Sequence, residues 1–426
     1  MSYLFNNLVT LTNGDAFGRT RISNPFTLAD YSHIYGESPE LITVTGGNGL
    51  ATAIPNFACI RLSVGTSSGD YVIHQSRMYH HYLPGKSQNI ISSFAFGPTT
   101  SNYAAKRIGY YDDRDGIYFQ QSGDGCLHWV KRSYVTGTAI DTGITQSDWN
   151  LDRCDGTGNS GFNIDTTKTQ LIFVDFQWLG VGRLRCGFVH DGEVIYAHEF
   201  LHSNILSTVY WSNPSLPIRC EVRNTATASG TASMDQICST VLSEGGYENS
   251  GIDFARFSGQ RSITVVNNSL PALSIRLKNS FNGFPNRSTV RINSIDALAE
   301  NATIRYELWR LPGGTVSGTQ SIQGGTWTSH SDDSVVEYNN TATGWTASGG
   351  FLMEIGYLAA NATGGQGQTR VPSSPQIQNP TNSKRSFISQ NYDSTNSNIF
   401  VVVVTALAVN GGTNDFRIGL QWRETK

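Results

Sequence analysis

The sequence predicts an all-β protein made of two antiparallel β-sandwiches in succession, preceded by an extended N-terminal arm. Gly is abundant at 44 residues, Asn, Ser and Thr are frequent, and the apolar residues are weighted to Val, Ile, Phe and Tyr, a composition typical of twisted sheets and tight turns. No long stretch repeats helix-forming residues with a 3.6-residue period. Strand-like runs follow one another through Gly-rich turns instead, which favours packed antiparallel sheets over a parallel α/β layout.

The length of 426 residues indicates more than one domain, because single cores rarely grow past about 250 to 300 residues. We expect an extended arm at 1–40, a β-sandwich at 41–245 and a second β-sandwich with long polar loops at 246–426. The arm is interrupted by Asn13-Gly14 and Asn24-Pro25, so it needs another surface to lie on.

The clearest element of the first sandwich is a hairpin in the middle of the chain. The run Gln170 to Trp178 is largely apolar, and Arg183 to Val189 leads through His190-Asp191-Gly192-Glu193 into Val194 to Phe200. Asp-Gly between two alternating runs is a strong short-range hairpin signal.

A second series of strands begins after a linker at Ser243 to Gly251. The loops Pro312 to Gly325 and Asn361 to Arg385 are polar and rich in Gly, Ser, Asn and Gln, so we expect them to lie outside the core. The expected strands are Arg261 to Val266, Leu273 to Leu277, Thr289 to Ile295 and Thr303 to Leu311, closed by Ile399 to Val409 and Phe416 to Trp422.

Charge and cysteine usage exclude several classes of function. A formal net charge of −3 provides no broad cationic field for nucleic acid or an acidic membrane surface. The six cysteines are far apart in the sequence, which argues against a zinc ribbon and favours buried, reduced thiols. No segment has the apolar length of a membrane span or of a signal peptide, so we expect no membrane insertion.

The string His198-Glu199-Phe200-Leu201-His202 matches the zinc-protease signature His-Glu-x-x-His. That motif needs a helix, where residues four apart share a face. Here it continues a hairpin arm, and on a strand the two imidazoles would lie about 13 Å apart. We therefore interpret it as a chance match.

Two acidic loops, Asp112 to Gly116 and Asp152 to Asn159, suggest a calcium site, but neither has EF-hand spacing, and Asp-Gly is also a common turn dipeptide. Turns are the favoured interpretation, with calcium kept as the alternative. Tyr79, His80, His81 and Tyr82 suggest either a polar and aromatic surface for sugars or a neighbouring subunit, or an amphipathic strand.

Glycoside hydrolysis would require two carboxylates that face each other across a groove. Asp175, Glu193 and Glu199 are candidates, but nothing in the sequence brings a pair together. No Ser/His/Asp arrangement and no phosphate-binding glycine loop are present. We predict no catalytic residue, no cofactor and no metal.

Four segments carry a family resemblance. Asp15-Ala16-Phe17-Gly18-Arg19-Thr20-Arg21-Ile22-Ser23-Asn24-Pro25-Phe26-Thr27-Leu28 resembles an N-terminal signature of structural proteins from marine and cyanobacterial tailed phages and some giant viruses. The other three follow in order through the first half of the chain: Gln75-Ser76-Arg77 with Pro84-Gly85-Lys86-Ser87-Gln88, then Asp155-Gly156-Thr157-Gly158, then Trp178-Leu179-Gly180-Val181-Gly182-Arg183-Leu184-Arg185 with Gly187-Phe188. The segment Asp175 to His202 also resembles the core hairpin of a concanavalin-like jelly roll.

The resemblance implies a virion structural protein of the head, neck or tail fibre, assembled in the host cytoplasm. We expect a homo-oligomer, with a trimer as the first expectation, and other virion proteins as partners. The expected anchor residues of the arm are Asp15, Arg19, Arg21, Asn24, Pro25 and Phe26. The alternatives are an adhesin that binds host surface glycans and, second, a polysaccharide depolymerase.

Overall fold

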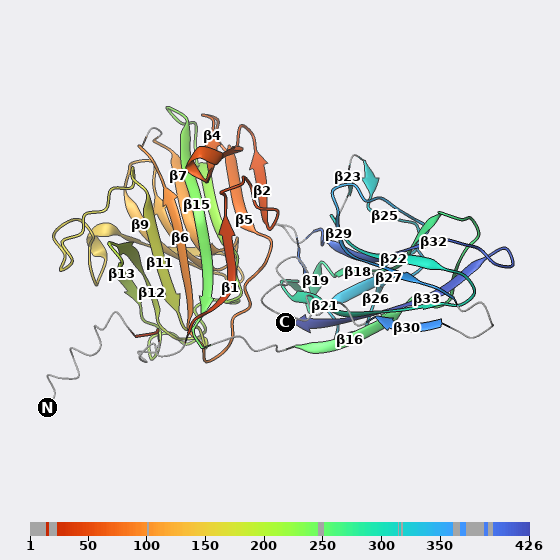
Figure 1. Ribbon diagram of the computed structural model, residues 1–426. Coiled ribbons are helices and arrows are strands. Elements are labelled where there is room, and N and C mark those ends of the chain that lie inside the picture. The colour runs from red at the N-terminus through yellow and green to blue at the C-terminus, as the bar shows by residue number, and fades with distance from the viewer. Residues whose placement is uncertain are drawn as a thin grey trace. The chain divides into compact units, whose positions relative to one another are not determined.

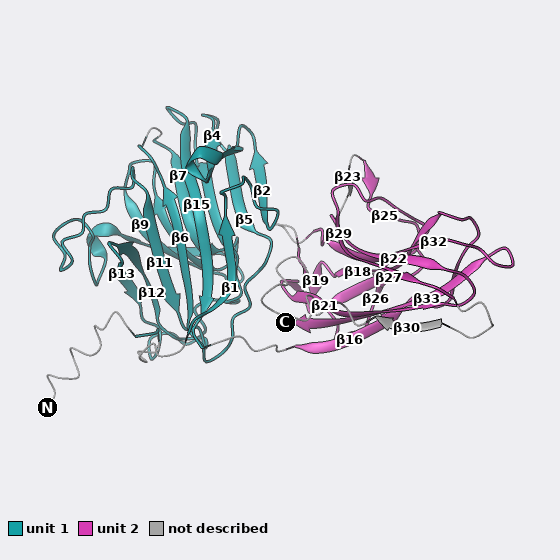
Figure 2. Ribbon diagram, in the orientation of Figure 1, with its two compact units in different colours: residues 1–248 teal, residues 249–426 magenta. Residues whose placement is uncertain are grey.

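The computed structural model divides the chain into two compact units, Met1–Glu248 and Asn249–Lys426, each described by itself (Figure 2). It describes residues 14–16, 24–99, 102–245, 251–313, 318–360, 387–390 and 395–426, and only the backbone of 315–316 and 367–371. Strands dominate these residues, and the helices described there are two three-residue 3₁₀ turns, η1 (Pro55–Phe57) and η2 (Gln146–Asp148) (Figure 1). The predicted all-β class with successive antiparallel β-sandwiches is confirmed.

The first unit contains two antiparallel sheets. Among the described residues, the eight-stranded sheet has the order β13-β12-β11-β6-β15-β4-β3, and β1 also pairs with β15. Its strands are β1 (Phe26–Ser32), β3 (Leu50–Ile54), β4 (Cys59–Val64), β6 (Gln88–Ala95), β11 (Gln170–Phe176), β12 (Leu184–His190), β13 (Glu193–Phe200) and β15 (Ala232–Ser243).

The seven-stranded sheet has the order β10-β9-β8-β7-β14-β5-β2, again counted over the described part of the chain. Its strands are β2 (Leu41–Gly46), β5 (Tyr71–Ser76), β7 (Ala104–Tyr111), β8 (Gly116–Gln121), β9 (Leu127–Ser133), β10 (Ile140–Thr145) and β14 (Ile218–Asn224).

Aromatic side chains fill the space between these two sheets. Phe119 of β8 stacks on Phe96 at a centroid distance of 5.5 Å and lies 5.1 Å from both Trp129 and Phe188. All four side chains are fully buried. Each large apolar side chain contributes about 1.5 to 3 kcal/mol when it is buried, so this cluster accounts for much of the sandwich's cohesion.

Part of the expected N-terminal arm is a strand of the first sandwich. β1 lies inside the expected arm, and it pairs with the last six residues of β15. On the same side of β15, β4 pairs with the first five residues of that strand. Ala29 and Tyr31 of β1 are buried. These residues alternate inward and outward like any other strand, so residues 26–32 belong to the body of the sandwich.

The predicted hairpin is confirmed in detail. β12 and β13 pair from Leu184↔Phe200 to His190↔Glu193, which leaves a two-residue turn of Asp191 and Gly192. Both turn residues have positive φ, 50° and 83°, as a type I′ turn requires.

The second unit is also a sandwich of two sheets. One has the order β16-β33-β21-β30 with β17 and β31 at its margins, and the other has the order β26-β27-β18-β32-β22-β29. The first sheet contains β16 (Ile252–Phe257), β17 (Arg261–Ile263), β21 (Thr289–Ala299), β30 (Gly367–Val371), β31 (Phe387–Ile388) and β33 (Asn414–Thr425). The second contains β18 (Ser269–Leu277), β22 (Ile304–Leu311), β26 (Thr328–Ser329), β27 (Val336–Asn339), β29 (Phe351–Leu358) and β32 (Ile399–Ala406).

The core of this sandwich depends on β32, whose residues are all buried. Phe400, Val402 and Val404 face the main core, while Ile399, Val401 and Val403 join a second, smaller cluster on the other side. In the described part of this unit there are also three short two-stranded sheets: β19 (Ser280–Phe281) with β20 (Phe284–Pro285), β23 (Thr315–Val316) with β24 (Thr319–Gln320), and β25 (Ile322–Gln323) with β28 (Gly344–Trp345).

Both segments expected to be loops contribute structure. Ile322 of the first segment is buried in the smaller cluster, where it helps to cover the apolar side of β32 that faces away from the main core. Gly367–Val371 of the second forms β30 and pairs with β21. The cysteines also depart in part from expectation, since Cys126 and Cys238 are exposed whereas the other four thiols are buried.

Candidate functional site

Charged and aromatic side chains gather on the outer face of the seven-stranded sheet. On β14, Arg219, Glu221 and Arg223 point outward, and they alternate with Cys220 and Val222, which are fully buried on the core side. We call this the outer face; it is defined by the residues that share the outward side of β5, β14, β7, β8, β9 and β10.

Glu221 lies at the centre of the outer face and is 1% exposed. Its carboxylate lies 2.7 Å from Arg223 Nε, 2.9 Å from Arg219 Nη2 and 3.6 Å from Arg107 Nη1. Burial alone would raise the pKa of this carboxyl, but the guanidinium groups of Arg219, Arg107 and Arg223 outweigh it and lower the pKa to about 2. Glu221 is therefore ionised at neutral pH.

Tyrosine rings lie beneath the guanidinium groups. Arg223 lies over Tyr71 at 4.7 Å from the ring centroid, Arg107 over Tyr118 at 5.2 Å, and Arg219 over Tyr111 at 5.2 Å. These cation–π contacts hold the charged groups in fixed positions on an aromatic base. Burial raises the pKa of Tyr118 to about 12, so this phenol stays neutral.

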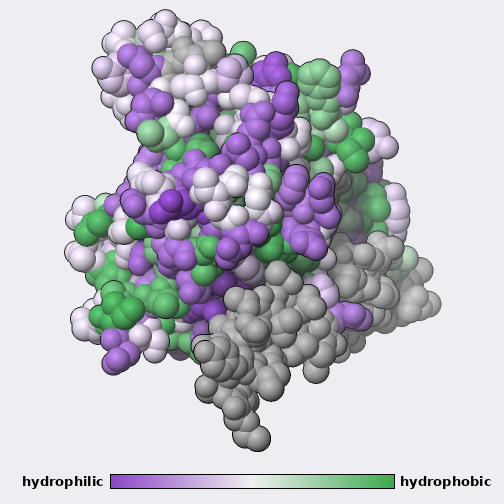
Figure 3. Space-filling model, turned by 90° about the vertical axis from the view of Figure 1, so that its left-hand side faces the viewer, coloured by the Kyte–Doolittle hydropathy of each residue, from purple (hydrophilic) through white to green (hydrophobic). Residues whose placement is uncertain are grey.

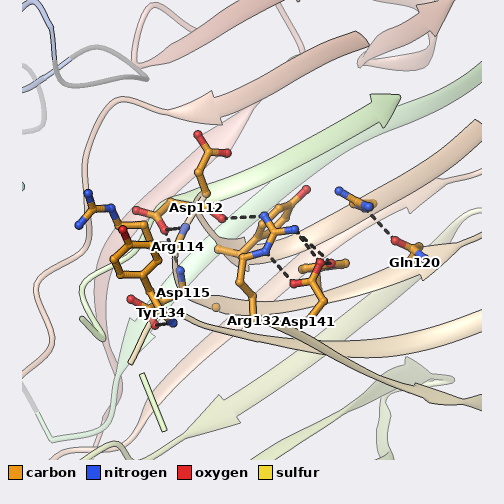
Figure 4. Close-up of polar contacts among 12 residues, drawn as sticks. Asp112, Arg114, Asp115, Gln120, Arg132, Tyr134 and Asp141 are labelled. Atoms are coloured by element: carbon orange, nitrogen blue, oxygen red, sulfur yellow. Dashed lines mark hydrogen bonds and ion pairs between the residues drawn. The ribbon is translucent and has the colours of Figure 1, made fainter. Parts of the chain in front are cut away.

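A second ion pair lies on β9 and β10, towards the edge of the same face, and Figure 4 shows its contacts. Arg132 of β9 donates to Asp141 of β10 through Nε and Nη2, both at 2.8 Å, a bidentate arrangement. Tyr118 also donates its hydroxyl to Asp141 at 2.9 Å. This carboxylate is thus fully engaged within the face.

Arg107 and Arg223 are the two guanidinium groups of the Glu221 cluster with most contact to solvent. Their side chains are 16% and 35% exposed, compared with 1% for Arg219. Arg107 donates through Nε to Gln120 Oε1 at 2.8 Å, and Arg223 donates through Nε to Glu221. Among the described residues, neither terminal amino group of Arg107 or Arg223 donates a hydrogen bond, apart from the 3.6 Å ion pair of Arg107.

A different cluster forms where the N-terminal segment meets the eight-stranded sheet. Arg185 Nη2 donates to the carbonyl of Gly14 at 3.0 Å, and Arg183 Nε donates to the carbonyl of Ala16 at 3.3 Å. The amide of Ala16 donates to Ser87 Oγ at 3.2 Å. The segment Gly14–Ala16 is thus held by Arg185 of β12, by Arg183 just before that strand and by Ser87 just before β6, and we call this contact the N-terminal dock.

The dock rests on a buried ion pair. Arg185 Nε lies 2.8 Å from Asp175 Oδ1, and Tyr196 donates its hydroxyl to the same carboxylate at 2.7 Å. Asp175 is fully buried and Arg185 is 5% exposed. The neighbouring Arg183 lies 3.6 Å from Glu199.

The six expected anchor residues divide into three groups. Asp15 is buried at the dock, at 4% exposure, so it faces its own sandwich. Asn24 and Pro25 are exposed, and Phe26 is half-buried at the start of β1. Arg19 and Arg21 lie outside the described residues.

The glycosidase candidates do not converge. Asp175 is fully buried in its pair with Arg185, Glu199 pairs with Arg183, and Glu193 is exposed at the hairpin turn. Glu193 and Glu199 lie six residues apart along one strand, which corresponds to about 20 Å. Two carboxylates of the outer face that the fold also places in ion pairs, Glu221 and Asp141, were not singled out for catalysis by the sequence.

The first three residues of the zinc-protease string end β13, so the string begins on a strand as its hairpin context predicts. His198 lies on β13 and accepts a hydrogen bond from the amide of Asn150 at 3.2 Å. His202 follows the strand, with Nδ1 2.7 Å from the carbonyl of Gly182 and Nε2 3.1 Å from Lys131 Nζ. Both imidazoles take part in polar contacts within the first sandwich. No cluster of three or more metal-binding side chains occurs among the described residues.

The acidic loops are turns closed by their own carboxylates. Asp112 accepts the amides of Arg114 and Asp115 (Figure 4). Asp152 accepts the amides of Cys154 and Ser160. These contacts are the local side chain to backbone bonds that Asp makes in turns.

The aromatic run at 79–82 faces inward. Tyr79, His80 and Tyr82 are buried, so of the two interpretations of this run, the sugar-binding or subunit-binding surface does not hold for these three residues. His80 bonds the carbonyl of Leu216 through Nδ1 and Tyr31 through Nε2. They pack between the sheets because the chain crosses from one sheet to the other here.

Comparison with known proteins gives no family for this chain. No family model matches it, and no curated protein matches it. Solved structures share parts of its fold at low identity. They include a carbohydrate-binding module of the evolved Dit protein of Lactobacillus casei BL23 phage J-1, at 7% identity and a TM-score of 0.35, with 53% of this chain and 98% of that chain covered.

Two further structures are similar at the same level. A legume lectin-like domain from Entamoeba histolytica has 8% identity and a TM-score of 0.32, covering 51% of this chain and 98% of the other. A family 16 endo-glucanase from Bacteroides ovatus has 8% identity and a TM-score of 0.33, covering 50% of this chain and all of the other. At such scores none of their functions passes to this chain.

The possibility of a membrane-spanning helix and the polarity of the surface were the two remaining features. No helix in the described part of the chain has the length and apolar character needed to span a bilayer. On the face drawn in Figure 3, hydrophobic residues occur in small groups separated by hydrophilic ones.

Proposed function

We propose that this chain is a non-enzymatic structural protein of a virion, in which the first sandwich holds the N-terminal segment and presents it to neighbouring subunits. The observation that supports this proposal most is the N-terminal dock. It joins three segments that carry the family resemblance, namely those containing Ala16, Ser87 and Arg183 with Arg185. These residues are up to about 170 positions apart in sequence, yet they meet at one place.

The dock suggests how the anchor works. Gly14–Ala16 are fixed to the sandwich by backbone contacts, and Asn24 and Pro25 remain exposed just before β1. The two described parts of the signature segment, Asp15–Ala16 and Asn24–Leu28, are therefore both placed on the first sandwich. We propose that the exposed Asn24 and Pro25 contact the neighbouring subunit.

Self-association is supported by the edge of the second unit. β29 ends its sheet and pairs on one side with β22 in the described part of the chain. Leu352, Ile355 and Tyr357 on this strand are 46%, 47% and 64% exposed. An open edge with exposed apolar side chains readily pairs with another strand, so we propose that a second copy of the chain binds here.

A direct test is to identify the chain in purified virus particles. Density-purified particles would be digested, and the peptides of this chain would be quantified by mass spectrometry against a known capsid protein. The proposal expects a fixed copy number per particle that survives a high-salt wash. Loss of the chain from the washed particles would reject it.

A second candidate function is the binding of host surface glycans. The outer face favours it, because guanidinium groups held over tyrosine rings and the amide of Gln120 lie side by side on one sheet. Polar groups held in fixed positions are what orients a bound sugar. Measurement of glycan binding by the isolated chain would test this function separately from assembly.

A further inference from the structure

The outer face has an excess of positive charge around Glu221. The guanidinium groups of Arg107, Arg219 and Arg223 surround two carboxylates, Glu221 and Asp113, the latter 2.7 Å from Arg219. Arg132 and Asp141 balance each other nearby. Counted over these described residues, the cluster holds three guanidinium groups and two carboxylates, so it has one more positive than negative charge, and Arg107 and Arg223 are its more exposed cations.

These two guanidinium groups are positioned for one ligand. Arg107 lies opposite Glu221 on the neighbouring strand, and Arg223 lies two residues further along β14, so both are on the same side of the sheet. Each is fixed through Nε and by a tyrosine ring. Their terminal amino groups form the planar fork that binds a carboxylate or sulfate with two parallel hydrogen bonds.

Polar groups continue from this point across the sheet in a straight row. The strand register places Gln120 of β8 opposite Arg107, His128 of β9 opposite Gln120, and Thr145 of β10 opposite His128. Neighbouring strands lie about 4.8 Å apart, so the row from Arg107 to Thr145 extends over about 14 Å. A single small anion would use only one end of such a row.

We propose that the outer face binds an acidic saccharide, with Arg107 and Arg223 holding its carboxylate or sulfate group and the row from Gln120 to Thr145 contacting the following sugar units. This inference rests on the second candidate function, glycan binding. Arg107 and Arg223 determine specificity for the charged sugar. Tyr71 and Tyr118 are positioning residues that hold the two guanidinium groups.

The test measures binding of the full-length chain to three polymers by isothermal titration calorimetry. Oligogalacturonate supplies carboxylates, dextran sulfate supplies sulfates, and dextran is neutral. The proposal expects Arg107→Gln and Arg223→Gln each to weaken binding of an acidic polymer at least tenfold. Arg107→Lys keeps the charge but loses the fork, and should also weaken binding.

Controls separate the outcomes. Arg61→Gln removes a partly exposed guanidinium from the opposite sheet, where it pairs with Asp235, and should leave binding unchanged. Unchanged thermal unfolding would establish that the Arg223 variant is folded. Equal affinity for dextran and the acidic polymers would overturn the acidic specificity and leave glycan binding standing. If Arg61→Gln weakened binding of the acidic polymers as much as Arg107→Gln does, the site proposed here would be overturned. If none of the three polymers bound, both this inference and the glycan-binding function would be overturned.

Discussion

Arg185 and Asp175 face each other on the neighbouring strands β12 and β11, with Arg185 Nε 2.8 Å from Asp175 Oδ1. The same guanidinium holds the carbonyl of Gly14 at 3.0 Å through Nη2. The guanidinium of this buried ion pair is therefore also the group that fixes the N-terminal segment. This connects the stability of the sandwich to the position of the segment through which we propose the chain assembles.

Replacing Arg185 should lower the free energy of unfolding of the first sandwich. Arg185→Leu leaves the fully buried carboxylate of Asp175 without its cation, and breaking a buried pair in this way costs about 3 to 5 kcal/mol. Urea unfolding followed by tryptophan fluorescence would measure the loss. The N-terminal segment should also become sensitive to protease at concentrations that leave the wild type intact.

The matched control is Arg61→Leu. This arginine forms an ion pair with Asp235 in which the two side chains are 43% and 20% exposed. Such pairs contribute about 0 to 1 kcal/mol, so the variant should unfold close to wild type. Equal losses in the Arg61 and Arg185 variants would contradict the importance of the buried pair.

Acid should destabilise the first sandwich through Glu221. Its pKa is about 2 in the folded state, below the ordinary value of 4.5, so the folded state binds fewer protons than the unfolded state between these values. The stabilisation is present above pH 4.5 and is lost as the pH falls towards 2. The free energy of unfolding of Glu221→Gln should therefore fall less between pH 5 and pH 3 than that of the wild type. An identical pH profile would refute this account.

A second acid-sensitive element is the histidine pair His33 and His74, whose ring centroids lie 5.3 Å apart. Burial lowers the pKa of both, and for His74 the nearby His33 lowers it further, to about 3. Because both pKa values lie below the ordinary 6.5, stability should fall as the pH drops below about 6.5. His33→Phe should reduce the loss of melting temperature between pH 7 and pH 5. If the melting temperature of the variant fell as much as that of the wild type, the histidine pair would not be the cause of this acid sensitivity.

Self-association should depend on β29. Ile355→Lys places a charge on the open edge, where the native Glu354 points inward to Tyr306. We expect light scattering to report a smaller mass for this variant at concentrations where the wild type is oligomeric. Leu50→Lys changes another exposed apolar edge residue, on β3, and should leave the mass unchanged. The β29 interface would be excluded if the Ile355 variant kept the wild-type mass.

The sequence predicted the local elements best. The β12–β13 hairpin could be read from Asp191-Gly192 between two alternating runs, because a type I′ turn depends only on nearby residues. β29 was missed, although it has strand-forming residues, since its edge position exposes side chains on both faces and blurs the alternation. β1 was assigned to an arm because its pairing with β15 joins residues more than 200 positions apart.

The outer face could not be predicted from the sequence, because its parts come from distant strands. Arg107 and Glu221 are separated by more than 100 residues and meet only through the β7–β14 register. One signal was available: in Arg219-Cys220-Glu221-Val222-Arg223 charged and apolar residues alternate with a period of two, typical of a strand with one polar face. The partners of these charges could not be known without the sheet order.

The most direct test of the structural role is cryo-electron microscopy of purified virions with this chain located in the map. The account predicts repeated copies in a symmetric arrangement, with the segment around Asn24 and Pro25 contacting a neighbouring subunit and the N-terminal dock occupied as in the isolated chain. Particles whose density is complete without this chain would contradict the proposal.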